Sequence, residues 1–189
     1  MNNLLTSCEQ TDEQLAAQAA REDSDGPAFV ALLNRYQQRV WSICFRLMGN
    51  AEDANDAAQE VFVRLFLNRN KFRGQSKYST WAHGVSLRTC LALRRGRSRR
   101  RRHEDEARQQ STQTASDAVQ DSLDLNQMLN TLDEEDRAML ILKYAQGHSF
   151  EELAEMFGLT TSACKMRVSR AREKLKQRFP DHNFGRETD

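Results

Sequence analysis

Apolar residues recur at helical spacing in the first half of the chain. Across residues 29–47 they stand three or four positions apart, and the pattern stops at Gly49-Asn50, a pair that commonly ends helices. A second apolar stripe runs through residues 54–66 with the same spacing. We therefore expect two amphipathic helices, the second beginning near Glu52, each with one side in a hydrophobic core.

The second predicted helix carries a distinct pattern on the side away from its apolar stripe. With residues placed at about 100° intervals, Asp56, Glu60, Val63 and Leu67 fall in one narrow band. Two acids followed by two apolar residues suit docking against a partner surface that is basic and apolar. The alternative is an ordinary solvated face with scattered apolar residues, which are common on protein surfaces.

A strongly basic segment follows these helices. Residues 71–102 contain eleven Lys and Arg and no acid, although the whole chain has a net charge of only +1. Such a segment attracts polyanions, and the planar donor groups of Arg suit phosphates and base edges. A basic tail in solvent is the alternative. A helix is expected here, capped by Ser79 or Thr80 and ending near Arg95, with Trp81 packed in the core.

The remaining composition predicts an all-α fold of two small helical domains. Seven Val and two Ile leave little material for β-sheets. Residues 103–121 are polar and rich in Gln, Ser and Thr, so we expect a flexible linker there. It would join an N-terminal domain, 27–102, to a C-terminal domain, 122–179, with an N-terminal extension at 1–26 and a tail at 180–189.

Helix-start signals divide the C-terminal domain. Asp133 can cap one helix, and Ser149 opens the capping-box sequence Ser-Phe-Glu-Glu of a short second helix. After a glycine, Thr160 or Thr161 can cap a last, basic helix that runs to about Arg178. A short helix, a Gly-containing turn and a longer basic helix predict a helix-turn-helix.

The last predicted helix has two chemically different sides. Cys164, Val168, Ala171 and Leu175 form a stripe expected to be buried. We expect the opposite polar side to enter a DNA major groove while its basic flanks contact phosphates, rather than to be a solvated amphipathic surface. The residues predicted to contact DNA are Thr161, Ser162, Lys165, Met166, Arg167, Ser169 and Arg170.

Two stretches of the chain resemble one family. The run NAEDANDAAQEVFVRLF at 50–66 resembles the polymerase-binding helix of bacterial sigma factors of the extracytoplasmic-function (ECF) group. The run KMRVSRAR at 165–172 resembles the part of that family that reads the upstream promoter element. Both runs occur in the family's order, and the two domain-length stretches to which they belong together span about 28–178. The resemblance implies a sigma factor that binds core RNA polymerase and directs promoter-specific initiation.

The resemblance also implies partners and site residues. Core polymerase would be contacted through the clamp of its β′ subunit and the flap of its β subunit, promoter DNA would be bound, and an anti-sigma factor is a possible regulator. The resemblance implies that Asp56, Gln59 and Glu60 lie at the contact with polymerase, and the helical face described above adds Val63 and Leu67 to the predicted polymerase-binding residues. Those that open the downstream promoter element would be Arg73, Gln75, Ser76, Lys77, Arg88, Arg94, Arg95 and Arg97, with Arg88 where the family usually has Asn.

Other classes of function find little support in the sequence. The four cysteines are far apart and form no CxxC pair, so we expect neither a metal site nor a cofactor, and no constellation of catalytic residues is visible. No apolar run approaches the roughly 20 residues of a membrane span, and no signal sequence is recognised, so we expect a cytoplasmic protein. The remaining alternative is a stand-alone helix-turn-helix regulator that binds duplex DNA without polymerase.

Overall fold

The computed structural model describes residues 10–22, 26–107, 125 and 127–180 of the 189-residue chain. All regular secondary structure in these residues is helical, as the composition predicts. The chain divides into two compact units, and each is described by itself. No helix in the described ranges is long and apolar enough to cross a membrane.

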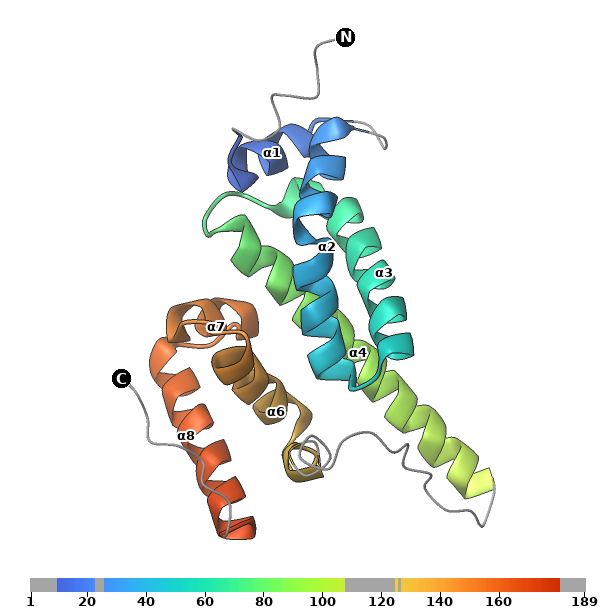
Figure 1. Cartoon of the computed structure of the whole chain (residues 1–189), viewed down its shortest axis with the longest axis vertical. Coiled ribbons are helices and arrows are strands. Elements are labelled where there is room, and N and C mark those ends of the chain that lie inside the picture. The colour runs from blue at the N-terminus through green and yellow to red at the C-terminus, as the bar shows by residue number, and fades with distance from the viewer. Residues whose placement is uncertain (1–9, 23–25, 108–124, 126, 181–189) are drawn as a thin grey trace. The chain divides into compact units, whose positions relative to one another are not determined.

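The N-terminal unit is built around an antiparallel helix pair. Figure 1 shows α2 and α3 side by side, joined by a tight turn at Gly49 and Asn50. Gly49 has a φ of 90°, a left-handed conformation that glycine adopts at little cost, and the Asn50 side chain accepts a hydrogen bond from the Asp53 N–H at 2.9 Å. The helices of this unit are α1 (Asp12–Ala19), α2 (Pro27–Met48), α3 (Ala51–Leu67), the short 3₁₀ helix η2 (Arg69–Lys71) and the part of α4 (Tyr78–Ala107) that runs to Cys90.

The predicted apolar stripes of α2 and α3 form the core of this unit. Val40 on α2 and Val61 on α3 are completely buried, as are the small residues Ala54 and Ala57. Small side chains on one helix allow its neighbour to approach closely, which is how a few turns of helix bury a dense core. The helical period therefore predicted correctly which sides of α2 and α3 are buried.

Helix α1 was not predicted from the sequence. It lies within residues 1–26, which we expected to be an extension outside the N-terminal domain, and it packs on α2. Thr11 and Gln14 form a capping box at its start, a signal that the sequence contains. The Asp12 carboxylate accepts hydrogen bonds from Arg35 at 2.7 Å and from the Tyr36 hydroxyl at 2.5 Å. The folded N-terminal domain thus begins before Pro27.

Helix α4 differs from its prediction at both ends. It begins at Tyr78, so neither Ser79 nor Thr80 is its N-cap. It continues to Ala107 instead of ending near Arg95, and the first five residues of the predicted linker are therefore helical. Arg, Leu and Ala are strong helix formers, which explains why the basic run extends the helix. The rest of the predicted linker, 108–121, lies outside the described residues.

The C-terminal unit contains the predicted helix-turn-helix. Ser149 and Glu152 form the expected capping box, with the Glu152 N–H donating to the Ser149 hydroxyl at 3.1 Å, and Thr160 rather than Thr161 caps the last helix. Asp133 precedes its helix as predicted, but its side chain makes no capping hydrogen bond and lies 3.8 Å from Lys174 Nζ instead. The elements are α6 (Glu134–Leu140), the π-helical turn η3 (Ile141–Ala145), α7 (Phe150–Phe157) and α8 (Thr161–Arg178).

Candidate polymerase- and nucleic-acid-binding surfaces

The predicted acidic and apolar band of α3 lies on the protein surface. Asp56 and Gln59 are exposed, and the exposed fractions of Val63 and Leu67 are 51% and 64%. Glu60 is partly exposed, and its carboxylate accepts a hydrogen bond from Arg64 Nε at 2.6 Å. We call these five residues, 56, 59, 60, 63 and 67, the α3 band. The exposure of its two apolar side chains, Val63 and Leu67, is the feature that indicates a binding partner.

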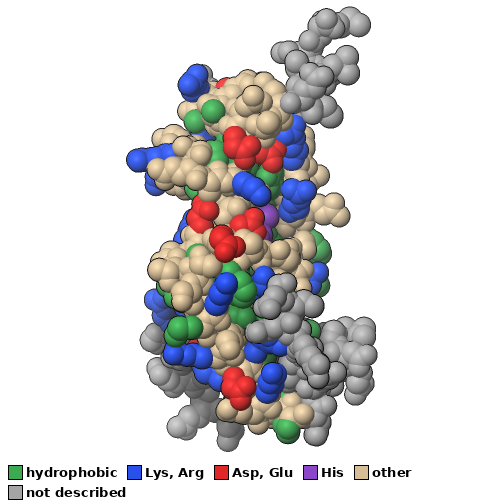
Figure 2. Space-filling model, turned by 90° about the vertical axis from the view of Figure 1, so that its left-hand side faces the viewer, with side chains coloured by type: hydrophobic (Ala, Val, Ile, Leu, Met, Phe, Trp, Pro, Cys, Tyr) green, Lys and Arg blue, Asp and Glu red, His purple; other side chains and the backbone are tan. Residues whose placement is uncertain are grey.

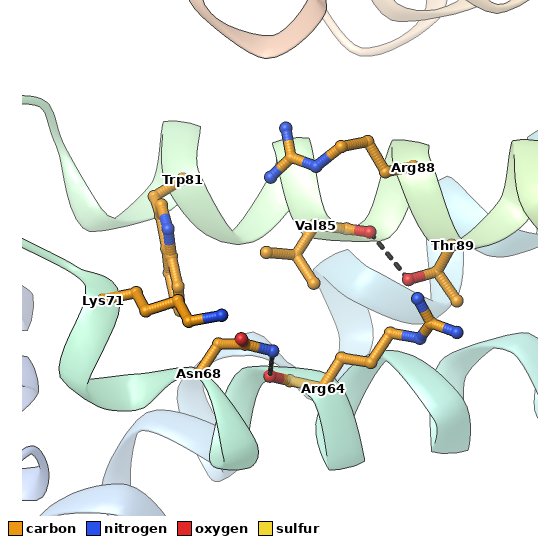
Figure 3. A pocket seen from close by; sticks show the side chains of 7 residues that line it. All are labelled: Arg64, Asn68, Lys71, Trp81, Val85, Arg88 and Thr89. Carbon is orange, nitrogen blue, oxygen red and sulfur yellow. Dashed lines mark hydrogen bonds between the residues drawn. The ribbon is translucent and has the colours of Figure 1, made fainter.

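A small pocket lies between the end of α3, the turn η2 and the first half of α4. Its volume is about 250 Å³. Figure 3 shows the ring of Trp81 standing at one end and the side chains of Lys71 and Asn68 lying between the two helices. The pocket is lined by Arg64, Asn68, Lys71, Trp81, Val85, Arg88 and Thr89. Three of these seven side chains are cationic and none is acidic, so the pocket favours an anionic or electron-rich ligand.

The chemistry of the pocket wall suits an unpaired nucleotide. The side-chain NH₂ group of Asn68 donates a hydrogen bond to the backbone carbonyl oxygen of Arg64 at 2.7 Å. This bond orients the Asn68 amide oxygen, which can accept a hydrogen bond from a ligand. Thr89 donates to the Val85 carbonyl oxygen at 2.8 Å, so its hydroxyl donor is already used. An aromatic ring beside Lys and Arg side chains is the combination with which proteins hold single-stranded nucleic acid.

The loop before α4 is held beside this pocket by aromatic contacts. Phe72 packs against Tyr78 and Trp81, with ring centroids 5.3 Å and 5.6 Å apart. Of the loop residues predicted to bind DNA, Arg73, Gln75 and Lys77 are exposed and Ser76 is partly buried. The aromatic anchors thus present a basic loop next to the cationic pocket. Trp81 is half-buried and belongs both to this aromatic cluster and to the pocket wall, whereas the sequence favoured core packing over a binding role for it.

The other predicted residues of α4 separate into two groups. Arg88 is exposed and lines the pocket, whereas Arg94, Arg95 and Arg97 lie further along the helix and do not line it. Of the seven lining residues only Arg88 was predicted to bind DNA; sequence reasoning missed Arg64, Asn68, Lys71, Trp81, Val85 and Thr89. Lys71 belongs to the basic run that the sequence analysis noted, but no pattern in the sequence indicates that η2 turns it toward α4.

Helix α8 presents most of its predicted DNA-contacting residues to solvent. Cys164, Val168, Ala171 and Leu175 are buried, which confirms the predicted stripe. On the other side of the helix, Ser162, Lys165, Met166, Ser169 and Arg170 are exposed, and Thr161 at the helix start is partly exposed. An exposed row of small polar, basic and apolar groups at the start of a helix can contact base edges and thymine methyl groups in a major groove.

Arg167 is an exception on this helix. Its Nε lies 2.6 Å from Asp136 Oδ1 and its Nη1 lies 3.0 Å from Glu135 Oε2, so the guanidinium joins α8 to α6. The Asp136 side chain is only 9% exposed, which makes this pair a packing element of the domain. Burial acts to lower the pKa of Arg167, but the hydrogen bonds that its guanidinium donates to Asp136 and Glu135 outweigh it and raise the pKa above its ordinary value.

One face of the protein carries side chains of both charges. On the face shown in Figure 2, Lys and Arg side chains lie among Asp and Glu side chains, as expected for a nearly neutral chain. Within the described ranges, no group of three or more His, Cys, Asp or Glu side chains is arranged to hold a metal ion.

Comparison with known proteins identifies both domains. Residues 32–100 match the family description "Sigma-70 region 2", and residues 122–175 match "Sigma-70, region 4". Two solved structures share the fold: the sigma factor RpoE with the anti-sigma factor NepR from Bartonella quintana, and CnrH with the cytosolic domain of CnrY. Their TM-scores are 0.63 and 0.65, both at 24% identity, and they cover 82% and 92% of this chain and 98% and 100% of their own.

Curated relatives agree along most of the chain. RNA polymerase sigma factor YlaC of Bacillus subtilis is 30% identical over 153 residues, which cover 77% of this chain and 88% of the relative. ECF RNA polymerase sigma factor SigW of the same organism is 28% identical over 173 residues, covering 83% and 91%. A helix-turn-helix domain preceded by a region 2 domain defines a promoter-recognition subunit of RNA polymerase. The chain belongs to the ECF group of the sigma-70 family.

Membership of this family decides between the two functions that the sequence left open. The protein is a non-enzymatic subunit that binds core RNA polymerase and directs promoter recognition and transcription initiation. A stand-alone helix-turn-helix regulator would not account for the region 2 match over residues 32–100.

Proposed function

We propose that three surfaces of this protein carry out different steps of transcription initiation. The α3 band docks on the clamp of the polymerase β′ subunit, the pocket of α3, η2 and α4 holds unpaired DNA of the downstream promoter element, and the start of α8 reads the upstream element. Region 4 also contacts the flap of the β subunit, and the protein acts in the cytoplasm with the polymerase. The exposure of Val63 and Leu67 beside acids carries this proposal, because it supports a protein partner rather than DNA.

Docking through the α3 band combines apolar burial with charge. Exposed Val63 and Leu67 would leave water on binding, while Asp56 and Glu60 would pair with basic groups of the clamp. Negative charge on this band would also repel DNA phosphates, which separates the protein-facing surface from the DNA-facing ones.

Charge reversal tests the docking surface. Asp56→Lys and Glu60→Lys should each weaken association of the full chain with core polymerase in the absence of DNA, measured by size-exclusion chromatography and biolayer interferometry. Glu173→Lys, an exposed position on α8, makes the same change in net charge and is the matched control. If the α3 variants associate as tightly as the control, the α3 band is not the docking surface.

Strand opening tests the pocket. Lys71→Ala and Arg88→Ala should leave a promoter bound by holoenzyme but reduce the permanganate reactivity of its unpaired thymines, because fewer cations hold the opened strand. Arg46→Ala, an exposed basic position on α2, is the control for lost charge. Equal reactivity in all three variants would remove the pocket from the proposal.

Run-off transcription connects these surfaces to activity. With core polymerase, the full chain should start transcription at promoters that core alone does not use, and without core it should bind duplex DNA weakly. We also propose an anti-sigma partner, supported by the solved sigma factor RpoE, which was crystallised in complex with the anti-sigma factor NepR. A regulator that covers the α3 band would compete with core polymerase for this chain. Simultaneous binding of regulator and core would contradict that arrangement.

A further inference from the structure

Two aromatic side chains of α2 are exposed and stacked on each other. The exposed fractions of Trp41 and Phe45 are 37% and 41%. Their ring centroids are 5.1 Å apart and the ring planes differ by only 11°. Large aromatic side chains that remain in water, one helical turn apart, are uncommon away from binding surfaces.

A hydrogen bond fixes this stack to α3. Trp41 Nε1 donates to Asn55 Oδ1 at 2.6 Å, and Asn55 immediately precedes Asp56 of the α3 band. The indole donor is thus satisfied within the protein, and the ring is held in one orientation before any partner arrives. Pre-organised aromatic groups lose little conformational entropy on binding. The stack is therefore a rigid apolar patch adjoining the α3 band.

The surroundings of the stack favour a protein partner. The first turn of α3 carries Glu52 and Asp53, and Asp56 follows one turn later. These acids would repel the phosphates that accompany any nucleic-acid base stacked on Trp41. An apolar or cationic side chain of a protein, by contrast, gains from both the rings and the adjacent carboxylates.

We infer that the Trp41–Phe45 stack extends the core-polymerase docking surface from α3 onto α2. This inference rests on the proposed role of the α3 band, because continuity with that band names the occupant. The partner segment is expected to be the same basic and apolar surface of core polymerase, with an apolar or cationic side chain covering the two rings. Aromatic side chains at a covered position often contribute a large share of binding energy.

The experiment measures affinity for core polymerase without DNA, using the full chain. Trp41→Ala and Phe45→Glu should each weaken binding about tenfold or more, as expected for central aromatic contacts. Asn55→Ala, which only loosens the stack, should cause a smaller loss. Val30→Glu is the matched control: Val30 is exposed on the same helix but lies eleven residues before Trp41, about 16 Å along the axis, and its substitution should not change affinity.

Asp56→Lys, measured in the same series, separates the possible failures. If Asp56→Lys weakens binding while Trp41→Ala and Phe45→Glu do not, the stack is not part of the interface and the inference is overturned, although docking through α3 stands. If none of the three has an effect, the proposed docking surface and the inference both fail. Trp41→Phe keeps a stacked ring but removes the indole donor. If it binds core polymerase with unchanged affinity and has an unchanged melting temperature, the loss in Trp41→Ala reflects the missing ring contact rather than a folding defect.

Discussion

Replacing Arg167 with Ala should destabilise the C-terminal domain more than it weakens DNA binding. The substitution leaves Asp136, whose side chain is 9% exposed, with Lys174 Nζ at 3.6 Å as its remaining cationic contact. Breaking a buried pair by removing one partner costs about 3–5 kcal/mol. Because the Arg167 side chain is itself about one-third exposed, water screens part of this interaction, and we expect a loss of about 2–3 kcal/mol.

Arg170 provides the contrast, because it lies three residues further along α8 and is exposed. Arg170→Ala should change the free energy of unfolding by no more than about 0.5 kcal/mol. Holoenzyme carrying it should bind promoter DNA more weakly, and the salt dependence of the affinity should flatten by about one unit if the lost contact is to a phosphate.

The two variants are compared by two measurements on the full chain. Hydrogen exchange of α8 amides reports the stability of the C-terminal domain, which tryptophan fluorescence does not, because both tryptophans, Trp41 and Trp81, belong to the N-terminal domain. Fluorescence anisotropy over a series of salt concentrations reports promoter binding by holoenzyme. If Arg167→Ala leaves α8 protection unchanged and flattens the salt dependence, Arg167 contacts DNA and its pairing with Asp136 is incidental.

Three further predictions concern stability. Asp12→Ala should lower the free energy of unfolding by about 1–3 kcal/mol, because it leaves the buried Tyr36 hydroxyl without its acceptor. Urea unfolding monitored by tryptophan fluorescence measures this loss, and a loss below about 0.5 kcal/mol would show that the contact of α1 with α2 does not stabilise the domain. Burial raises the pKa of Tyr36 and of Tyr78 above the ordinary value near 10, so the stability that these phenols contribute is complete below about pH 10 and is lost as pH rises through the raised values. Absorbance at 295 nm should show two of the three tyrosines ionising only as the protein unfolds, and early ionisation of all three would refute this. Ser149→Ala should reduce α7 stability by about 0.5–2 kcal/mol in hydrogen exchange, because it removes the acceptor for the Glu152 N–H, and unchanged protection would show that the cap is dispensable.

The sequence predicted those parts of the fold that depend on helical periodicity. The buried side of α8, with Val168 at its centre, and the exposed positions Val63 and Leu67 of α3 follow from 3.6 residues per turn, because a long helix against a core has only one side to bury. Local signals also located two helix caps. Ser149 was recognised as the start of a capping box, and Asn50 lies at the predicted boundary between the first two helices.

The packing of α1 on α2 and the ion pair of Arg167 could not be predicted in this way. Asp12 meets Arg35 and Tyr36 more than twenty residues away, and Arg167 meets Asp136 thirty-one residues away. Such pairings depend on how helices pack, which periodicity within one helix does not specify. A basic residue in a recognition helix reads the same in sequence whether it points to DNA or to a carboxylate of its own domain.

The α3 band and the cationic pocket are adjacent on α3, and this affects how their variants should be interpreted. Glu60 belongs to the band, while its ion-pair partner Arg64 lines the pocket. Glu60→Lys therefore removes a docking carboxylate and also places a like charge beside Arg64, which perturbs the pocket. Asp56 has no such link to the pocket lining. Loss of core binding in Asp56→Lys with normal strand opening at saturating protein would assign docking to the band alone, whereas Glu60→Lys should impair both steps.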